Sequence, residues 1–93
     1  MTQGGQHKLI EAERIFKALA NRRRLAIVQY LAKHSRSVSD IADHLRLSLP
    51  STSRHLHTLA RVDLIESRQT NTSVIYSIPK DTHATLEVAL KLL

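Results

Sequence analysis

Side chains that donate hydrogen bonds recur along one face of a segment near the middle of the chain. Helical spacing from Ser48 to Arg61 gives an apolar face made of Thr52, Leu56, Leu59 and Ala60. The opposite face carries hydroxyls, an imidazole and two guanidiniums: Ser51, Ser53, Arg54, His57, Thr58 and Arg61. The segment contains no carboxylate. A packed back and a donor-rich front suit a helix that enters the major groove of DNA.

Arg54 is the best single candidate for a DNA contact, because Arg is the commonest specific reader of guanine edges. A contact with phosphate alone is the equal alternative. We expect Ser51 and Ser53 to position the helix rather than to specify sequence. We place His57 at the DNA surface, whereas His55 lies nearer the packed side and is expected to be structural. The two histidines point away from each other on a helix, so they make a poor metal pair.

A second group of candidate DNA contacts lies in a predicted β-hairpin. Enrichment in β-branched and aromatic residues predicts strands over residues 64–69 and 73–78. The expected contacts are Arg68, Gln69, Thr70 and Asn71. Asn71 is the residue of the connecting turn best able to take a positive φ.

Length and charge fit this interpretation. The chain has 93 residues, enough for one small domain, and a formal net charge of +6. This balance suggests an anionic partner, with nucleic acid as the first candidate, although a merely basic soluble surface is the alternative. No apolar run approaches the roughly 20 residues of a membrane span, so we expect no membrane association. Residues 1–6 lack a signal-peptide core, so we expect a cytoplasmic protein with a flexible N-terminus.

Metal sites and catalysis find little support. The absence of Cys excludes thiolate ligands and disulfides. No nucleophile has a paired base, and no Gly-rich phosphate loop is present, so we do not expect an enzyme or a cofactor.

The remaining elements would position these groups. Apolar spacing predicts five helices, over residues 7–20, 22–33, 38–45, 49–61 and 81–93. Ser37, Ser48 and Asn21 are the expected N-caps. A helix-turn-helix followed by a hairpin predicts a winged helix-turn-helix, mainly α with a two-stranded wing, in a single domain over residues 1–93. The wide apolar stripe of residues 81–93 needs a cover, for which a partner chain is the natural candidate.

Three consecutive arginines, Arg22 to Arg24, begin the second helix, where the helix dipole disfavours cations. A bound phosphate would explain them. The alternative is one internal ion pair with the other two arginines solvated.

Three segments resemble the ArsR/SmtB family of bacterial winged-helix repressors. They are residues 16–28 (FKALANRRRLAIV), 48–59 (SLPSTSRHLHTL) and 67–78 (SRQTNTSVIYSI). The second is similar to the family's recognition helix and the third to its wing. The resemblance implies a homodimer built on residues 7–20 and 81–93.

The chain departs from the family pattern at four positions. Leu49 replaces a usual Gln, which puts base readout there in doubt, and Arg46 replaces the Gly of the turn. Asn71 and Thr72 replace a Gly and a basic residue of the wing, so we expect weaker phosphate binding there.

Many members of the resembled family sense metals. Asp81 and His83 match half of one family site, and the partner half would fall near the end of this chain, where Lys91 and Leu92 offer no suitable ligand. We therefore expect no metal site and no control by zinc.

We interpret the chain as a homodimeric transcriptional regulator, a repressor that binds a palindromic operator in double-stranded DNA. The alternatives are a winged helix used for protein interaction and one that binds RNA. The operator, the target genes and the inducing signal do not follow from the sequence.

Overall fold

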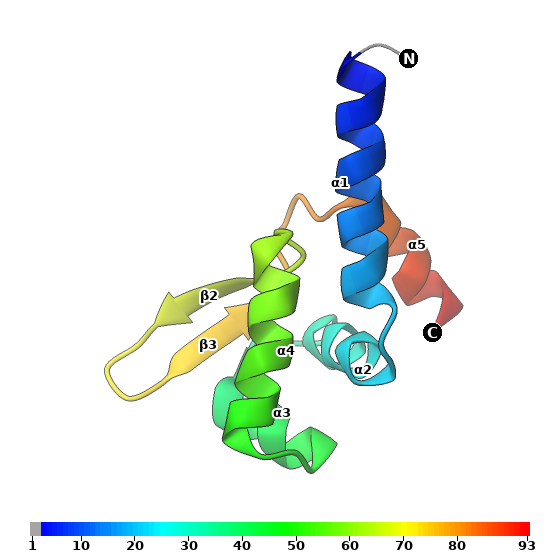
Figure 1. The fold of residues 1–93 in the computed structure, drawn as a ribbon. Helices are drawn as coiled ribbons and strands as arrows, with labels where there is room; N and C mark the ends of the chain where they lie inside the picture. Colours follow the sequence, from blue (N-terminus) through cyan, green and yellow to red (C-terminus); the bar gives the residue numbers. More distant parts are fainter. Residues whose placement is uncertain (1–2) are drawn as a thin grey trace.

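The computed structural model describes residues 3–93, and side chains from residue 5 onward. Over these residues the elements are α1 (Gln3–Leu19), α2 (Arg22–Leu31), β1 (Arg36–Ser37), α3 (Val38–Leu45), α4 (Leu49–Arg61), β2 (Glu66–Gln69), β3 (Val74–Ser77) and α5 (Ala84–Leu92). α1 and α5 lie on one side of the molecule, and the β2–β3 hairpin projects on the other, beyond α4 (Figure 1). This is the predicted winged helix-turn-helix, with α3 and α4 as the helix-turn-helix and the hairpin as the wing.

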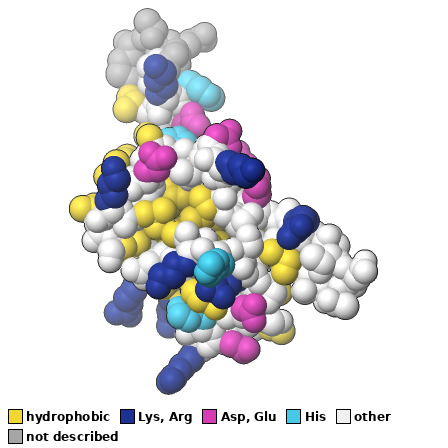
Figure 2. Space-filling model, turned by 180° about the vertical axis from the view of Figure 1, so that it is seen from behind, with side chains coloured by type: hydrophobic (Ala, Val, Ile, Leu, Met, Phe, Trp, Pro, Cys, Tyr) yellow, Lys and Arg dark blue, Asp and Glu magenta, His cyan; other side chains and the backbone are white. Residues whose placement is uncertain are grey.

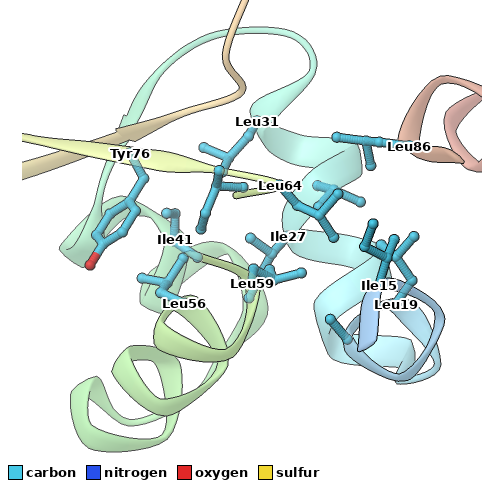
Figure 3. Close-up of a cluster of buried hydrophobic side chains, with 13 residues drawn as sticks. Ile15, Leu19, Ile27, Leu31, Ile41, Leu56, Leu59, Leu64, Tyr76 and Leu86 are labelled. Atoms are coloured by element: carbon cyan, nitrogen blue, oxygen red, sulfur yellow. The ribbon is translucent and has the colours of Figure 1, made fainter. Parts of the chain in front are cut away.

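The hydrophobic core surrounds α2, whose Ile27 and Val28 are completely buried. α1, α4 and α5 all add side chains to the same cluster: Ile15, Leu19, Leu56, Leu59 and Leu86 (Figure 3). The core is almost wholly aliphatic, since the chain has only two Tyr and one Phe. Each fully buried Leu or Ile contributes roughly 1.5–3 kcal/mol. The shared core therefore holds α4 firmly against the rest of the domain.

Side-chain caps set the limits of the helix-turn-helix, as the sequence predicts. The Ser37 hydroxyl accepts a hydrogen bond from the Asp40 N–H at 3.0 Å, and the Ser48 hydroxyl accepts one from the Ser51 N–H at 3.1 Å. Arg46 ends α3 in the left-handed conformation, with φ 57° and ψ 44°. A non-glycine residue is disfavoured there, so the missing turn glycine leaves local strain.

The sheet has one more strand than the sequence predicts. β3 is the central strand, and it pairs antiparallel with both β1 and β2. Tyr76 of β3 lies opposite Arg36 on one side and Ser67 on the other. β1 is only two residues long, too short to show a periodic pattern. It joins the wing to the start of α3.

The expectation of a positive φ at Asn71 is wrong. Among the described residues, only Arg46 and Asp63 combine a side chain with a positive φ. Thr70 and Ser73 close the turn instead. The Thr70 N–H donates to the Ser73 carbonyl at 2.8 Å, and the Ser73 N–H donates to the Thr70 hydroxyl at 3.0 Å. These hydrogen bonds hold the turn without a left-handed residue.

The terminal helices differ from their predicted limits. α1 begins at Gln3 rather than at residue 7, because a helix that has formed extends at little cost. Met1 and Thr2 lie outside the described residues. α5 begins at Ala84 rather than at residue 81. His83 is its N-cap, and its ring nitrogen Nδ1 accepts from the Thr85 N–H at 3.3 Å.

Candidate nucleic-acid interface

α4 has the two faces that its sequence predicts. Thr52, Leu56 and Leu59 are buried, and Ala60 is half-buried beside them. The buried Thr52 hydroxyl donates to the Ser48 carbonyl at 2.9 Å, which satisfies its hydrogen-bonding capacity inside the helix. The opposite face of α4 is therefore the one left for a partner.

The candidate contact residues of α4 lie along this open face. Arg54, His57 and Arg61 are exposed, while Ser51 and Ser53 are half-buried near the start of the helix. Asp and Glu are absent from α4, so no carboxylate on this helix would repel a phosphate backbone.

Arg61 differs from the others in its surroundings. It lines an open hollow of about 410 Å³ between α1, α2 and α4. Arg14 and Lys17 of α1 line the same hollow. The open face of α4 thus continues at its C-terminal end into basic side chains of α1.

The wing forms a second exposed group, separated from α4. Arg68, Gln69 and Asn71 are exposed, whereas Thr70 is half-buried and its hydroxyl donates to the Ser73 carbonyl at 2.9 Å. The hairpin tip points away from α4 (Figure 1), and it carries no charged side chain from Gln69 to Ser73. Helix and wing are therefore placed to touch different parts of a ligand.

Of the three arginines at the start of α2, Arg24 makes contacts within the protein that the sequence analysis did not predict. Its Nε donates to the Ala18 carbonyl at 2.5 Å and its Nη2 donates to the Lys17 carbonyl at 3.1 Å. Both carbonyls belong to the last turn of α1, and a positive charge at this end of a helix is stabilising. The expected alternative of an internal ion pair is therefore wrong in its detail: the arginine caps a helix. Arg22 and Arg23 are exposed.

The same guanidinium reaches the recognition helix. Arg24 Nη1 lies 3.3 Å from Nδ1 of His55. Arginine only donates, so Nδ1 of His55 accepts and carries no proton. Burial lowers the pKa of His55, and the charges of Arg24, Arg23 and Arg54 lower this pKa further. His55 is thus a structural residue, as the sequence predicts, but its partner is 31 residues away and left no sequence signal.

A second contact that the sequence did not reveal joins α2, α3 and β1. The rings of Tyr30 and His44 stack with centroids 3.8 Å apart, and the Arg36 guanidinium lies 4.3 Å from the Tyr30 centroid. Such contacts stabilise a fold by about 0.5–1 kcal/mol each at partly exposed sites. They connect Tyr30 of α2 to the last turn of α3 and to β1, which precedes α3.

Asp81 and His83 do not form a metal site with other described residues of the same chain. Asp81 lies before α5 rather than on it, and Nδ1 of His83 is engaged as the cap of that helix. Within residues 3–93, no three His, Cys, Asp or Glu side chains gather in a way that could hold a metal ion.

Apolar side chains are exposed on the face formed by α1 and α5. Figure 2, drawn from behind, shows hydrophobic side chains gathered on one face with charged groups around them. Phe16 is 59% exposed and Val88 is 60% exposed, and both line a shallow hollow of about 370 Å³. No helix of the described part of the chain is long and apolar enough to cross a bilayer.

Residues 21–67, which include α2, the helix-turn-helix and the start of the wing, match the family described as "Bacterial regulatory protein, arsR family". The chain belongs to the ArsR family. The match covers the five candidate contacts of α4, whereas the four candidates of the wing lie beyond it.

Three curated relatives of this ArsR-family chain are transcriptional regulators. Rv0324 of Mycobacterium tuberculosis is 37% identical over 84% of the chain and 34% of its own length. The activator HlyU of Vibrio cholerae is 36% identical over 69% of the chain and 59% of its own length. The repressor SdpR of Bacillus subtilis is 31% identical over 69% of the chain and 71% of its own length. The chain thus spans less than two thirds of the first two relatives.

A solved structure shares the whole arrangement. It is the homodimeric winged helix-turn-helix DNA-binding domain of Mb0332 from Mycobacterium bovis, 30% identical, with a TM-score of 0.88. The similarity covers 99% of this ArsR-family chain and 86% of the other.

Proposed function

We propose that this chain is a homodimeric transcriptional repressor that binds a palindromic operator in double-stranded DNA. The observation that carries the proposal is the open face of α4. It presents guanidinium, imidazole and hydroxyl groups without a carboxylate, and the shared core holds it in one orientation. Such a helix can read base edges, while the wing supplies contacts to the backbone beside it.

The exposed apolar face of α1 and α5 supports the homodimer. Phe16, Val88 and Leu92 are each more than half exposed, and an apolar patch of this kind marks an interaction surface. The homodimeric domain of Mb0332 has the same fold. A second copy of this chain is the partner that we propose.

A homodimer of this kind requires a matching symmetry in its DNA. Two α4 helices related by a twofold axis would enter successive major grooves on one side of the duplex. We expect half-sites about 10–10.5 base pairs apart, or a multiple of this distance. An imperfect palindrome meets that requirement.

Repression is the simplest use of such a complex, because occupation of a promoter requires no surface beyond the DNA-binding and dimer faces. Among the relatives, SdpR is named a repressor and HlyU an activator. The repressor role is therefore a separate proposal from DNA binding, and its test is transcription from the bound promoter with and without the protein.

The decisive experiment is selection of genomic DNA fragments by the purified protein, followed by sequencing and titration of the selected fragments. We expect a shared imperfect palindrome, and affinity for it that falls steeply with salt. An RNA copy of the same sequence and an unrelated duplex are the controls. Failure to enrich any sequence would contradict the proposal and favour a protein-interaction module, and tighter binding of the RNA would favour an RNA-binding domain.

A further inference from the structure

One exposed apolar side chain lies away from the dimer face. The large hydrophobic residues exposed among the described part of the chain belong to α1, to α5 or to the C-terminal residue, with the single exception of Leu49. Leu49 is the first residue of α4, and 52% of it is exposed. The neighbouring Pro50 is exposed as well.

The first turn of α4 holds Leu49 in a fixed place. The Ser48 hydroxyl caps the helix through the Ser51 N–H, and the Ser48 carbonyl accepts from both the N–H and the hydroxyl of Thr52. The buried Thr52 side chain anchors this turn to the core. Leu49 is therefore presented by a rigid helix start rather than by a mobile loop.

This position is the one from which a recognition helix reads bases. In helix-turn-helix proteins, the N-terminal residues of the second helix contact the base edges in the major groove. Leucine can neither donate nor accept a hydrogen bond there. The apolar group that the major groove offers is the 5-methyl group of thymine.

We propose that Leu49 recognises the 5-methyl group of a thymine in each half-site by apolar contact. The inference rests on the proposed binding of double-stranded DNA, and it adds a determinant of sequence. The expected loss of readout at this position is thereby replaced by readout of another kind, through a methyl group rather than through hydrogen bonds. Leu49 and Pro50 together form a continuous apolar surface, which would exclude water from around this methyl group.

The test removes only the methyl group. Each thymine of the selected operator is replaced in turn by deoxyuridine, which keeps every hydrogen bond of the base pair. We expect about a fourfold loss of affinity for each methyl group that Leu49 covers, as burial of one apolar carbon group predicts. The loss should occur at one thymine in each half-site.

Two variants assign the effect to this side chain. Leu49→Asn has a similar shape but is polar, so its affinity should be the same for the thymine and deoxyuridine operators. Leu49→Met remains apolar and should keep most of the discrimination. Both substitutions fall on an exposed side chain, and thermal unfolding will verify that the domain is intact.

The outcomes separate the inference from the function on which it rests. Operator binding that is unaffected by deoxyuridine at every thymine would overturn the role of Leu49 and leave the proposed function standing. An equal loss in wild type and in Leu49→Asn would also overturn it, because another group would then read the methyl. If the protein binds neither the thymine operator nor the deoxyuridine operator, both proposals are overturned.

Discussion

The guanidinium of Arg54 is exposed in the middle of α4, where it could read a base edge or contact a phosphate. If Arg54 reads a guanine, Arg54→Ala should weaken operator binding by about 1–3 kcal/mol and relax specificity at one base pair. Gel-shift titration on the selected operator and on versions changed at single positions measures both effects. An unchanged operator affinity would show that α4 is placed wrongly in the groove.

Arg68 in β2 provides the contrast, because we assign it to the phosphate backbone. Arg68→Ala should weaken binding to all duplexes similarly and reduce the salt slope by about one. A loss confined to the operator would instead place this side chain at a base.

We expect the burial of His55 and its contact with Arg24 to make the fold sensitive to acid. Burial and the neighbouring Arg24, Arg23 and Arg54 lower the pKa of His55 in the folded protein, so the unfolded chain binds a proton there more readily. This contribution to stability is fully present above the ordinary histidine pKa of about 6.5 and is lost as pH falls through the lower folded pKa. We therefore expect the free energy of unfolding to fall below about pH 6.5.

His55→Gln should reduce that pH dependence, as urea unfolding at pH 7.5 and pH 5.0 would show. The exposed His57 gives a matched control, since His57→Gln removes an imidazole outside the packed side. Equal pH dependence in wild type and in His55→Gln would exclude His55 as its source.

At the scale of elements, the left-handed residue at the end of α3 is a local weakness. Arg46 has φ 57°, where glycine is favoured. Arg46→Gly should raise the free energy of unfolding by about 0.5–1 kcal/mol, because relief of strain exceeds the added freedom of the unfolded chain. The urea midpoint should rise with an unchanged m-value. Arg46→Lys is the control, because it keeps the strain and should leave the free energy of unfolding unchanged. If Arg46→Gly instead lowers the free energy of unfolding, the arginine side chain itself stabilises the turn.

The helices were predictable because their signals are local. Ser37, Ser48 and Asn21 cap the three helices for which the sequence predicts them to do so. The apolar spacing also predicted the buried face of α4. The limits were less accurate at the two ends of the chain, where helix extension and the His83 cap decided them.

The missed features depend on contacts between distant residues. β1 exists only because β3 offers it a pairing edge, and two residues cannot show a period. The Arg24–His55 contact and the Tyr30–His44 stack join different helices and follow no spacing rule. The candidate DNA contacts were chosen from helical spacing and resemblance. Six of the nine are exposed, whereas Ser51, Ser53 and Thr70 are half-buried, and the binding roles of all nine stay predictions.

At the scale of the whole molecule, the apolar face of α1 and α5 should determine the oligomeric state. Val88 is 60% exposed in the single chain, so Val88→Glu should leave the fold intact but place a charge in the dimer interface. We expect wild type to sediment as a dimer without DNA at micromolar concentration, and the variant as a monomer with strongly reduced operator affinity, because two linked half-sites supply most of it.

Leu49→Ala is the control for removing an exposed apolar group outside this face, and it should remain dimeric. A wild-type monomer would contradict the homodimer and favour use of the domain for protein interaction.

The bonds that Arg24 makes also bear on how strictly an operator must be spaced. This one side chain ties the end of α1, on the dimer side, to His55 on the recognition helix. In a dimer, Arg24 would help to fix the separation and relative rotation of the two α4 helices. Wild type should therefore reject an operator with one extra base pair between its half-sites, because each added pair rotates one half-site by about 35°.

Arg24→Gln should tolerate that altered spacing better, even where it binds the original operator less tightly. The ratio of the two affinities measures this tolerance, and the exposed Arg23→Gln is the matched control for loss of one positive charge. An unchanged ratio would mean that the core alone sets the geometry. A changed ratio would mean that Arg24 helps to set the distance between half-sites that the dimer accepts. Arg24 would then influence the choice of operator without contacting a base.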